Sequence, residues 1–265
     1  MGFATLRTLT RNDALATLSS YIRSNTLHTA STPDAFHQGK QAVTKFWKEA
    51  GRDGEPAWSM RIPVFIEGVH PNRPGRRIVG RAKTLRFVAY RPDLFDRHGG
   101  GYNAQKQAFD TVNAGDVLVI EARGERGTGT VGDVLALRAQ VRGAAGIVTD
   151  GGVRDADAIA EFDIPVFSQG PHPSVLGRRH VPWETDGTIT CGGAAVQPGD
   201  VIVGDGDGVI VIPPTLVEEI AAEAVAQERE EAWVAGQVAA GASVDGLFPM
   251  DAVWRARYRA ETETR

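Results

Sequence analysis

Residues 127–157 constrain the fold more than any other part of this 265-residue chain. They follow a short apolar run, residues 117–120, which is typical of a buried strand. The intervening loop over residues 123–132 contains four glycines and two threonines, so it has little side-chain bulk. A second apolar run at residues 146–150 predicts another buried strand. Strands that alternate with a helical segment indicate an α/β fold.

A helix is predicted between these two strands, over residues 134–143. Apolar residues recur at helical spacing on one face of it, namely Val134, Leu137 and Val141. Asp133 stands at the N-cap or first-turn position, and a glycine at position 143 suits the helix end. A helix that begins after glycines presents free backbone N–H groups and a partial positive charge, which favour a carboxylate or a phosphate.

Two charged residues follow the second strand. Gly151 and Gly152 turn the chain, and Arg154 and Asp155 then lie at the carboxyl end of the strand, where ligands bind in open α/β sheets. An Arg offers a rigid fork to a carboxylate or enolate oxygen, and an Asp can be a hard oxygen ligand for Mg²⁺. We therefore predict an anion- and metal-binding site formed by Asp133, Arg154 and Asp155. A loop salt bridge and a simple helix cap are alternatives that the local pattern leaves open.

The composition argues against several classes of protein. The chain is 42% hydrophobic and 23% charged, as an ordinary globular protein is. Its net charge of −4 argues against a nucleic-acid-binding surface. The lone cysteine, Cys191, fits a reducing compartment, and neither a leader pattern nor a bilayer-length apolar run is found. We therefore expect a cytoplasmic protein with no nucleic-acid or membrane partner.

Further elements are expected along the rest of the chain. Helices are predicted over residues 12–24, 35–50, 103–112 and 215–236, and strands or hairpins over residues 75–88, 164–168, 187–196 and 201–212. Residues 197–200 carry a type II turn signal. His172 and His180 lack the convergence with further ligands that a His-based metal site requires.

Several motifs resemble one known family, which contains 4-hydroxy-4-methyl-2-oxoglutarate and 4-carboxy-4-hydroxy-2-oxoadipate aldolases and the regulator of ribonuclease activity A. The aldolase branch carries an Asp-x20-Arg-Asp signature, which Asp133, Arg154 and Asp155 match without a gap. Further motifs match in the same order: GDVLVIE at Gly115, RGAAGIVTDGGVRD at Arg142, IPVFSQG at Ile164, VQPGD at Val196 and GDGDGVIVIP at Gly204. The resemblance covers about residues 75–214.

The resemblance implies the fold and the assembly. It implies a layered ββα swivelling-type α/β domain, like the phosphohistidine domain, assembled as a homotrimer or homohexamer with sites between subunits. An RraA-like catalytic domain is expected over residues 1–214, including helices at the N-terminus. A helical extension is expected over residues 215–265. The apolar residues at positions 244–258 suggest that this extension packs on another subunit.

The resemblance also implies a lyase of the class II aldolase type that depends on Mg²⁺ or Mn²⁺. Such an enzyme cleaves a 4-hydroxy-2-oxo acid to pyruvate and a second carbonyl compound, and the same enolate chemistry would decarboxylate oxaloacetate. Asp155 is then the metal ligand. Arg154 binds the substrate and supports the developing oxyanion, and Asp133 orients a water that shuttles the proton.

The remaining implied site residues come from the helix start and from a neighbouring subunit. The backbone at Gly132, Val134 and Leu135 is expected to bind the substrate carboxylate. A Glu from the C-terminal helix of the neighbouring subunit reaches the active site in the aldolase branch. The spacing from the central motif makes this residue Glu230, with Glu228 and Glu231 as near alternatives.

Two other functions stay open at this point. The first is a metal-dependent dehydratase or hydrolase of a sugar-derived 2-oxo acid, because the segment at residues 38–58 does not resemble the family. The second is a non-catalytic protein-binding regulator of a ribonuclease. The intact Arg154–Asp155 pair favours the enzyme over the regulator.

Overall fold

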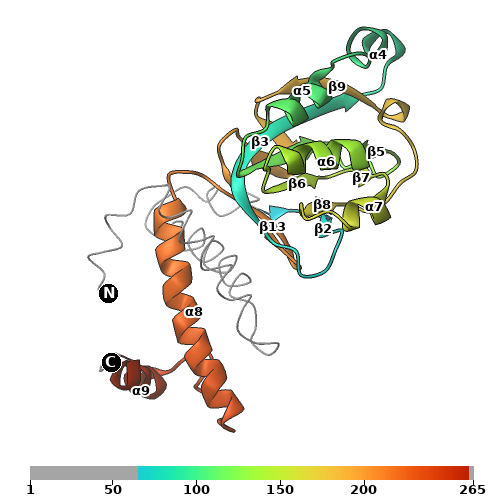
Figure 1. The fold of residues 1–265 in the computed structure, drawn as a ribbon. Helices are drawn as coiled ribbons and strands as arrows, with labels where there is room; N and C mark the ends of the chain where they lie inside the picture. The colour runs from blue at the N-terminus through green and yellow to red at the C-terminus, as the bar shows by residue number, and fades with distance from the viewer. Residues whose placement is uncertain (1–64, 263–265) are drawn as a thin grey trace. The chain divides into compact units, whose positions relative to one another are not determined.

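The computed structural model describes residues 65–262, whose elements are labelled in Figure 1. The helices predicted at residues 12–24 and 35–50 lie outside the described residues. The described chain divides into two compact units, residues 65–217 and residues 218–262. The predicted boundary between residues 214 and 215 lies close to this division and stays a prediction. Each unit is described below by itself.

The first unit is built on one mixed sheet. Its nine strands, among the residues described, have the order β1-β13-β12-β3-β4-β6-β8-β2, with β9 also paired to β3. They are β1 (Phe65–Ile66), β2 (His70–Pro71), β3 (Ile78–Ala89), β4 (Asp116–Glu121), β6 (Gly146–Thr149), β8 (Val166–Ser168), β9 (His180–Thr185), β12 (Val201–Asp205) and β13 (Gly208–Ile212). Strands β3, β4, β6 and β8 run parallel, whereas β12 and β13 form an antiparallel hairpin beside β3. The strands predicted from apolar runs and alternation are confirmed, and the fold is mixed α/β.

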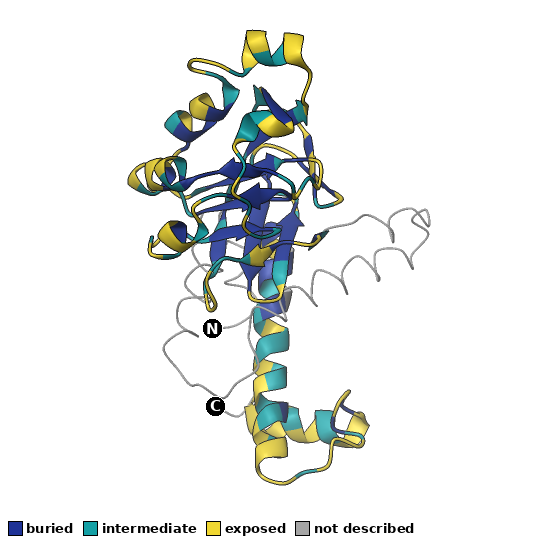
Figure 2. Cartoon of the chain, turned by 90° about the vertical axis from the view of Figure 1, so that its right-hand side faces the viewer, coloured by how far each residue is buried: buried dark blue, intermediate teal, exposed yellow. Residues whose placement is uncertain are grey.

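Helices and small strand pairs complete this unit. They are α4 (Pro92–His98), α5 (Ala104–Thr111), α6 (Asp133–Val141), α7 (Ala156–Ala160), the short 3-10 helix η2 (Leu176–Arg178), and the pairs β5 (Gly129–Val131) with β7 (Gly152–Val153) and β10 (Ile189–Cys191) with β11 (Ala194–Val196). Helices α5, α6 and α7 contribute to the same apolar cluster as β3, β4, β6 and β8. The β10–β11 hairpin belongs to a second cluster that includes other residues of β4, β6 and β8. Figure 2 shows the buried sheet and the helices whose outer sides are exposed. The more specific swivelling-type layering stays a prediction.

The core forms because the alternation of apolar residues in the sequence matches the alternation of side chains between the two faces of the sheet. Burial alternates along the first half of β3, so Ile78 and Ala82 are buried while Arg81 and Lys83 are not. Strand β4 has a continuous apolar run and is buried at all four of its central positions. The predicted turn at residues 197–200 is also confirmed: Asp200 N–H donates to Gln197 O at 3.1 Å, and Gly199 has φ of 88°.

The face of α6 that is buried differs from the face that helical spacing predicted. The residues that mark the predicted apolar face are exposed: Val134 is 73% and Val141 is 70% accessible, and Leu137 is exposed as well. The helix instead packs on the sheet through Ala136 and Ala139, which are fully buried. Small alanines allow the helix to lie close to the sheet, so the larger apolar side chains point away from it. The helix was predicted correctly, but its buried face was not.

The second unit consists of two helices and the loop between them. Helix α8 (Val217–Ala239) corresponds to the predicted helix at residues 215–236, and α9 (Ala252–Thr262) follows. Leu247 and Met250 from the loop are buried against Val234 of α8, and Trp233, Trp254 and Tyr258 pack around them. Much of the apolar tail therefore packs within its own chain. Val244, Phe248 and Val253 remain exposed.

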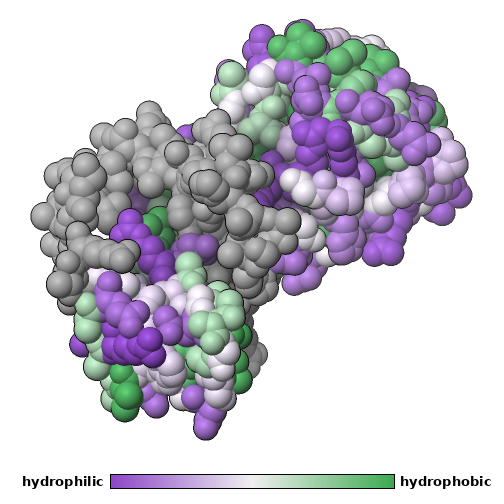
Figure 3. Space-filling model, turned by 60° about the horizontal axis from the view of Figure 1, so that its bottom comes forward, coloured by the Kyte–Doolittle hydropathy of each residue, from purple (hydrophilic) through white to green (hydrophobic). Residues whose placement is uncertain are grey.

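The coloured part of the face drawn in Figure 3 is largely polar. Figure 3 shows hydrophilic residues over most of the coloured part of this face, with separate hydrophobic groups among them. None of the helices in the described part of the chain has the length and apolar character required to cross a membrane.

Candidate active site

The two halves of the predicted site are joined by a short parallel pair of strands. Strand β5 leads into α6, and β7 leads into α7, so pairing β5 with β7 places the start of α6 beside the start of α7. Arg154 N–H donates to Val131 O at 2.8 Å, and the Thr130 hydroxyl donates to Gly152 O at 2.9 Å. The structure therefore brings residues 132–135 and residues 154–155 together, although they are distant in sequence.

Two glycines in this region are required by close approach of side chains. A Cβ at position 129 would lie 2.2 Å from Arg154 Cγ. A Cβ at position 132 would lie 2.9 Å from both Arg154 Nη2 and Asp155 Oδ2. The glycine-rich loop therefore leaves a space that the Arg154 side chain and the Asp155 carboxylate occupy, and any larger residue would displace them.

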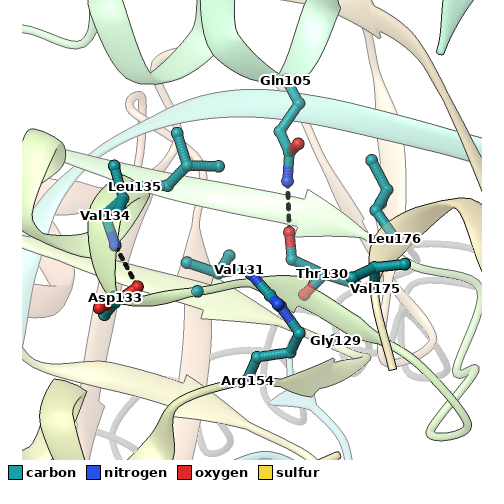
Figure 4. Close-up of a pocket in the computed structure, with 11 residues that line it drawn as sticks. Gln105, Gly129, Thr130, Val131, Asp133, Val134, Leu135, Arg154, Val175 and Leu176 are labelled. Atoms are coloured by element: carbon teal, nitrogen blue, oxygen red, sulfur yellow. Dashed lines mark hydrogen bonds between the residues drawn. The ribbon is translucent and has the colours of Figure 1, made fainter. Parts of the chain in front are cut away.

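A small cavity opens at the start of α6, and Figure 4 shows the side chains around it. Its volume is about 170 Å³. Its lining residues are Gln105, Gly129, Thr130, Val131, Gly132, Asp133, Val134, Leu135, Arg154, Val175 and Leu176. A cavity of about 150 Å³ holds benzene in another protein, so this space suits a group of about six or seven non-hydrogen atoms.

Arg154 is the cation of this cavity. Its side chain is 36% exposed, and its Nη2 lies 3.7 Å from Asp155 Oδ2. This distance is too long for a hydrogen bond. Within the described chain the guanidinium has no closer acidic partner. Its donors are therefore available to a bound anion.

Asp133 begins α6 at the rim of the cavity. Its Oδ1 accepts a hydrogen bond from the N–H of Val134 at 2.8 Å, as Figure 4 shows. This N–H was predicted to bind the substrate carboxylate, and in the structure it donates to Asp133. The other N–H groups of the first turn have no intrahelical carbonyl to bond, so the start of α6 remains suited to an anion.

Asp155 lies beside the cavity and is not among its lining residues. Its backbone is left-handed, with φ of 55° and ψ of 39°, a conformation that Asp tolerates better than most side chains. Its carboxylate is 41% exposed and close to Gly132. Among the described residues, no group of three or more His, Cys, Asp or Glu side chains could together hold a metal. A metal at Asp155 would therefore be bound by at most two such side chains of the described chain, with water and substrate oxygens as its other ligands.

Glu230 lies in the second unit, on α8. Its Oε2 is 3.5 Å from Arg255 Nη1 on α9, and both side chains are partly exposed. Within the described chain, the ion pair with Arg255 is the interaction that the Glu230 side chain makes. Its predicted role in the site of a neighbouring subunit stays a prediction.

A second cavity, of about 520 Å³, is lined by three acidic residues, and two of them, Asp150 and Glu121, are already hydrogen-bonded. Asp150 accepts hydrogen bonds from the N–H groups of Gly124 at 2.9 Å and Gly192 at 3.2 Å. Glu121 accepts from Arg86 Nε and from Thr190 N–H, both at 3.0 Å. These carboxylates hold loops together, and they leave this cavity a weaker candidate for catalysis.

His180 is fully buried at the start of β9 and stacks on Phe87, with ring centroids 5.3 Å apart. Its Nδ1 lies 3.3 Å from Arg123 Nη2, and its Nε2 is buried without a hydrogen-bond partner. Burial and the Arg123 charge lower the pKa of His180 to about 4, against a smaller opposing effect of Glu125. His180 is thus a neutral core residue.

The buried His180 should make the fold less stable in mild acid. Above pH 6.5 the imidazole is neutral in both the folded and the unfolded chain. Between pH 6.5 and about pH 4 the unfolded chain binds a proton that the folded chain does not, so the free energy of unfolding falls by up to about 1.4 kcal/mol per pH unit. Urea unfolding at pH 7.5 and pH 5.0 measures this change. The decrease in the free energy of unfolding from pH 7.5 to pH 5.0 should be smaller in His180→Gln and unchanged in the control His172→Gln. An equal decrease in the wild type and both variants would contradict the prediction.

Gln105 lines the cavity but was not predicted to be a site residue. It lies on α5, is 7% exposed, and donates a hydrogen bond from Nε2 to Thr130 O. One sequence signal could have found it. Gln105 precedes the buried Ala108 and Phe109 by about one helical turn, so it is a polar residue on the buried face of the predicted helix.

Comparisons with known proteins agree with the mixed α/β fold. The chain is 31% identical over 168 residues to a Halalkalibacterium halodurans protein provisionally named 4-hydroxy-4-methyl-2-oxoglutarate aldolase, covering 62% of this chain and 72% of that protein. A Hahella chejuensis protein with the same provisional name is 35% identical over 111 residues, covering 42% of this chain and 67% of that protein. The crystal structure of Streptomyces coelicolor RraAS2, described as an unusual member of the RNase ES inhibitor RraA protein family, matches with a TM-score of 0.64 and 30% identity, covering 77% of this chain and 98% of that chain.

The family model described as RraA-like: Aldolase/RraA matches residues 58–211. This span is more than half of the chain, and it includes Asp133, Arg154 and Asp155 together with the cavity. The chain therefore belongs to the RraA-like family, which includes both aldolases and RraA proteins.

Proposed function

We propose that this protein is a divalent-metal-dependent lyase that cleaves a 4-hydroxy-2-oxo acid to pyruvate and a second carbonyl compound. The observation that carries the proposal is the cavity at the start of α6, which is lined both by the Arg154 guanidinium, with only a long contact to Asp155, and by a carboxylate, Asp133. The cavity volume of about 170 Å³ suits the pyruvate half of such a substrate. The names of the aldolase relatives agree with this reaction.

The residues around the cavity have distinct roles in this proposal. The N-terminus of α6 and Arg154 bind the carboxylate and the 2-oxo group of the substrate. When the C3–C4 bond breaks, its electron pair forms the enolate of pyruvate, and Arg154 stabilises the negative charge on the enolate oxygen. The proton of the 4-hydroxyl group leaves through a water that Asp133 orients, and C3 of the enolate is protonated to give pyruvate.

Asp155 fits a hard divalent cation such as Mg²⁺ or Mn²⁺. Mg²⁺ is commonly bound by one or two carboxylates and retains several waters, so a lone carboxylate beside a substrate cavity is sufficient. The absence of a Cβ at Gly132 allows the Asp155 carboxylate to lie close to the start of α6. A cation there would supply positive charge that polarises the ketone and stabilises the enolate.

The assembly belongs to the same proposal. We expect a homotrimer or homohexamer in which Glu230 reaches the site of a neighbouring copy. The ion pair of Glu230 with Arg255 is long and partly exposed, so it could be exchanged for another partner at small cost. Val134 lines the cavity, and such a neighbour would cover it together with the other exposed apolar residues of α6, Leu137 and Val141.

A second candidate function is regulation of a ribonuclease by protein binding. The similarity to RraAS2, at 30% identity and over nearly all of that chain, favours it. The exposed apolar face of α6 would then contact a protein partner. This function requires neither metal binding nor the charge of Arg154, so the two candidates differ in a simple assay.

The test is release of pyruvate from 4-hydroxy-4-methyl-2-oxoglutarate and from oxaloacetate. With Mg²⁺ present we expect pyruvate from both substrates. EDTA should reduce the rate at least about hundredfold, because the enolate then loses its main positive charge. A coupled lactate dehydrogenase assay measures the product. Absence of release from either substrate, together with binding to a ribonuclease, would replace the lyase with the regulator.

A further inference from the structure

Gln105 occupies an unusual position for an uncharged polar residue. It lies on α5, is nearly fully buried, and lines the same cavity as Arg154. Because Thr130 O can only accept a hydrogen bond, the amide nitrogen of Gln105 must face it. The amide orientation is therefore determined, and Figure 4 shows the side chain extending from its helix toward Thr130.

This orientation leaves the carboxamide oxygen of Gln105 for another group. The described residues supply a partner for Nε2 but none for Oε1. The neighbouring lining residues Leu135, Val175 and Leu176 are apolar and cannot donate a side-chain hydrogen bond. This oxygen is not one of the buried side-chain atoms that lack a partner, so it is open to the cavity, where a ligand hydroxyl can take the place of the water that it would otherwise bind.

The other polar side chains of the cavity have different partners or charges. The Thr130 hydroxyl already donates to Gly152 O at 2.9 Å. Arg154 is a cation and suits the carboxylate or enolate, whereas Asp133 is an anion and suits a proton-carrying water. Gln105 is left as the neutral acceptor, which suits a hydroxyl group and does not neutralise Arg154.

We propose that Gln105 is a specificity-determining residue whose carboxamide oxygen accepts a hydrogen bond from the substrate hydroxyl on C4. The inference rests on the proposed lyase function and deepens it. It assigns the site to 4-hydroxy-2-oxo acids in preference to 2-oxo acids that lack this hydroxyl. The amide also holds the hydroxyl oxygen in place while its proton leaves.

The test compares two substrates in one variant. Gln105→Met keeps the length of the side chain but removes both polar groups. We expect kcat/KM for 4-hydroxy-4-methyl-2-oxoglutarate to fall about tenfold or more, while kcat/KM for oxaloacetate, which lacks the hydroxyl, changes less than about twofold. The ratio of the two values within one preparation is independent of the fraction of folded protein.

Gln107→Met is the matched control, because Gln107 lies on the same helix but is exposed and donates to Tyr102 O. It should leave both rates unchanged. An equal fall for both substrates in Gln105→Met would overturn the inference, since it would indicate a structural link between α5 and β5. No change for either substrate would overturn it as well.

A failure of the proposed lyase function can be distinguished from a failure of the proposed role of Gln105. In that case the wild-type protein releases no pyruvate from either acid. Calorimetric titration of the two acids, with metal omitted so that no turnover occurs, then makes the same comparison by affinity. Selective loss of affinity for the hydroxylated acid in Gln105→Met would support the role of Gln105 in recognition, and equal affinities in the variant and the wild type would overturn it.

Discussion

Replacing Arg154 with Met should lower kcat/KM for pyruvate release about hundredfold to a thousandfold. This is the usual effect of removing one group that stabilises a developing oxyanion. The guanidinium lines the cavity and has only a long contact with Asp155, so its charge is directed to the substrate. Arg154→Lys should recover only part of the loss, because an ammonium cannot reproduce the planar fork. Steady-state kinetics with 4-hydroxy-4-methyl-2-oxoglutarate measures both effects.

Arg126→Met provides the control for loss of an arginine in the same loop region. Arg126 is exposed and donates to Gln169 at 2.7 Å, away from the cavity lining. Its replacement should change kcat/KM less than about twofold. If Arg154→Met retained wild-type activity while remaining folded, the cavity at the start of α6 would not be the active site.

Replacing Asp155 with Asn should abolish both metal binding and turnover. The amide keeps the size of the side chain and tolerates the left-handed backbone, so the fold should be retained. It lacks the negative charge that a hard divalent cation requires. Mn²⁺ titration followed by electron paramagnetic resonance gives a readout that does not depend on activity, and pyruvate release gives the second.

Asp157→Asn is the matched control, because Asp157 lies two residues further along, in the first turn of α7. It should bind Mn²⁺ as the wild type does. Unchanged Mn²⁺ affinity in Asp155→Asn would place the metal elsewhere. If Asp155→Asn lost Mn²⁺ binding but retained turnover, the metal would have no role in the reaction.

The local signals in the sequence identified most elements of the described α/β unit. The apolar runs at β4 and β6 and the alternation in the first half of β3 are set by neighbouring residues in the chain, so they could be read directly. The same holds for the glycine turn before α6. The motif spacing also predicted that Asp133, Arg154 and Asp155 belong to one region, and the pairing of β5 with β7 places them there.

Other features depend on contacts that the sequence does not express. The apolar side of α6 was expected to be buried, but close packing of Ala136 and Ala139 on the sheet leaves Val134 and Val141 exposed. Helical spacing shows which residues share one face of a helix. The tertiary fold decides which of the faces is covered by another element. The predicted use of the Val134 N–H by substrate was likewise changed by a local bond to Asp133.

The α/β class, the family and the chemical groups of the candidate site could all be inferred from the amino-acid sequence. These follow from local periodicity and from residue types at characteristic spacings. Two features became apparent from the three-dimensional contacts: Gly132 leaves space for Arg154 and Asp155, and Gln105 from α5 completes the cavity. Both depend on close approach between segments far apart in the chain, because side-chain distances across such contacts are set by packing and not by the order of residues.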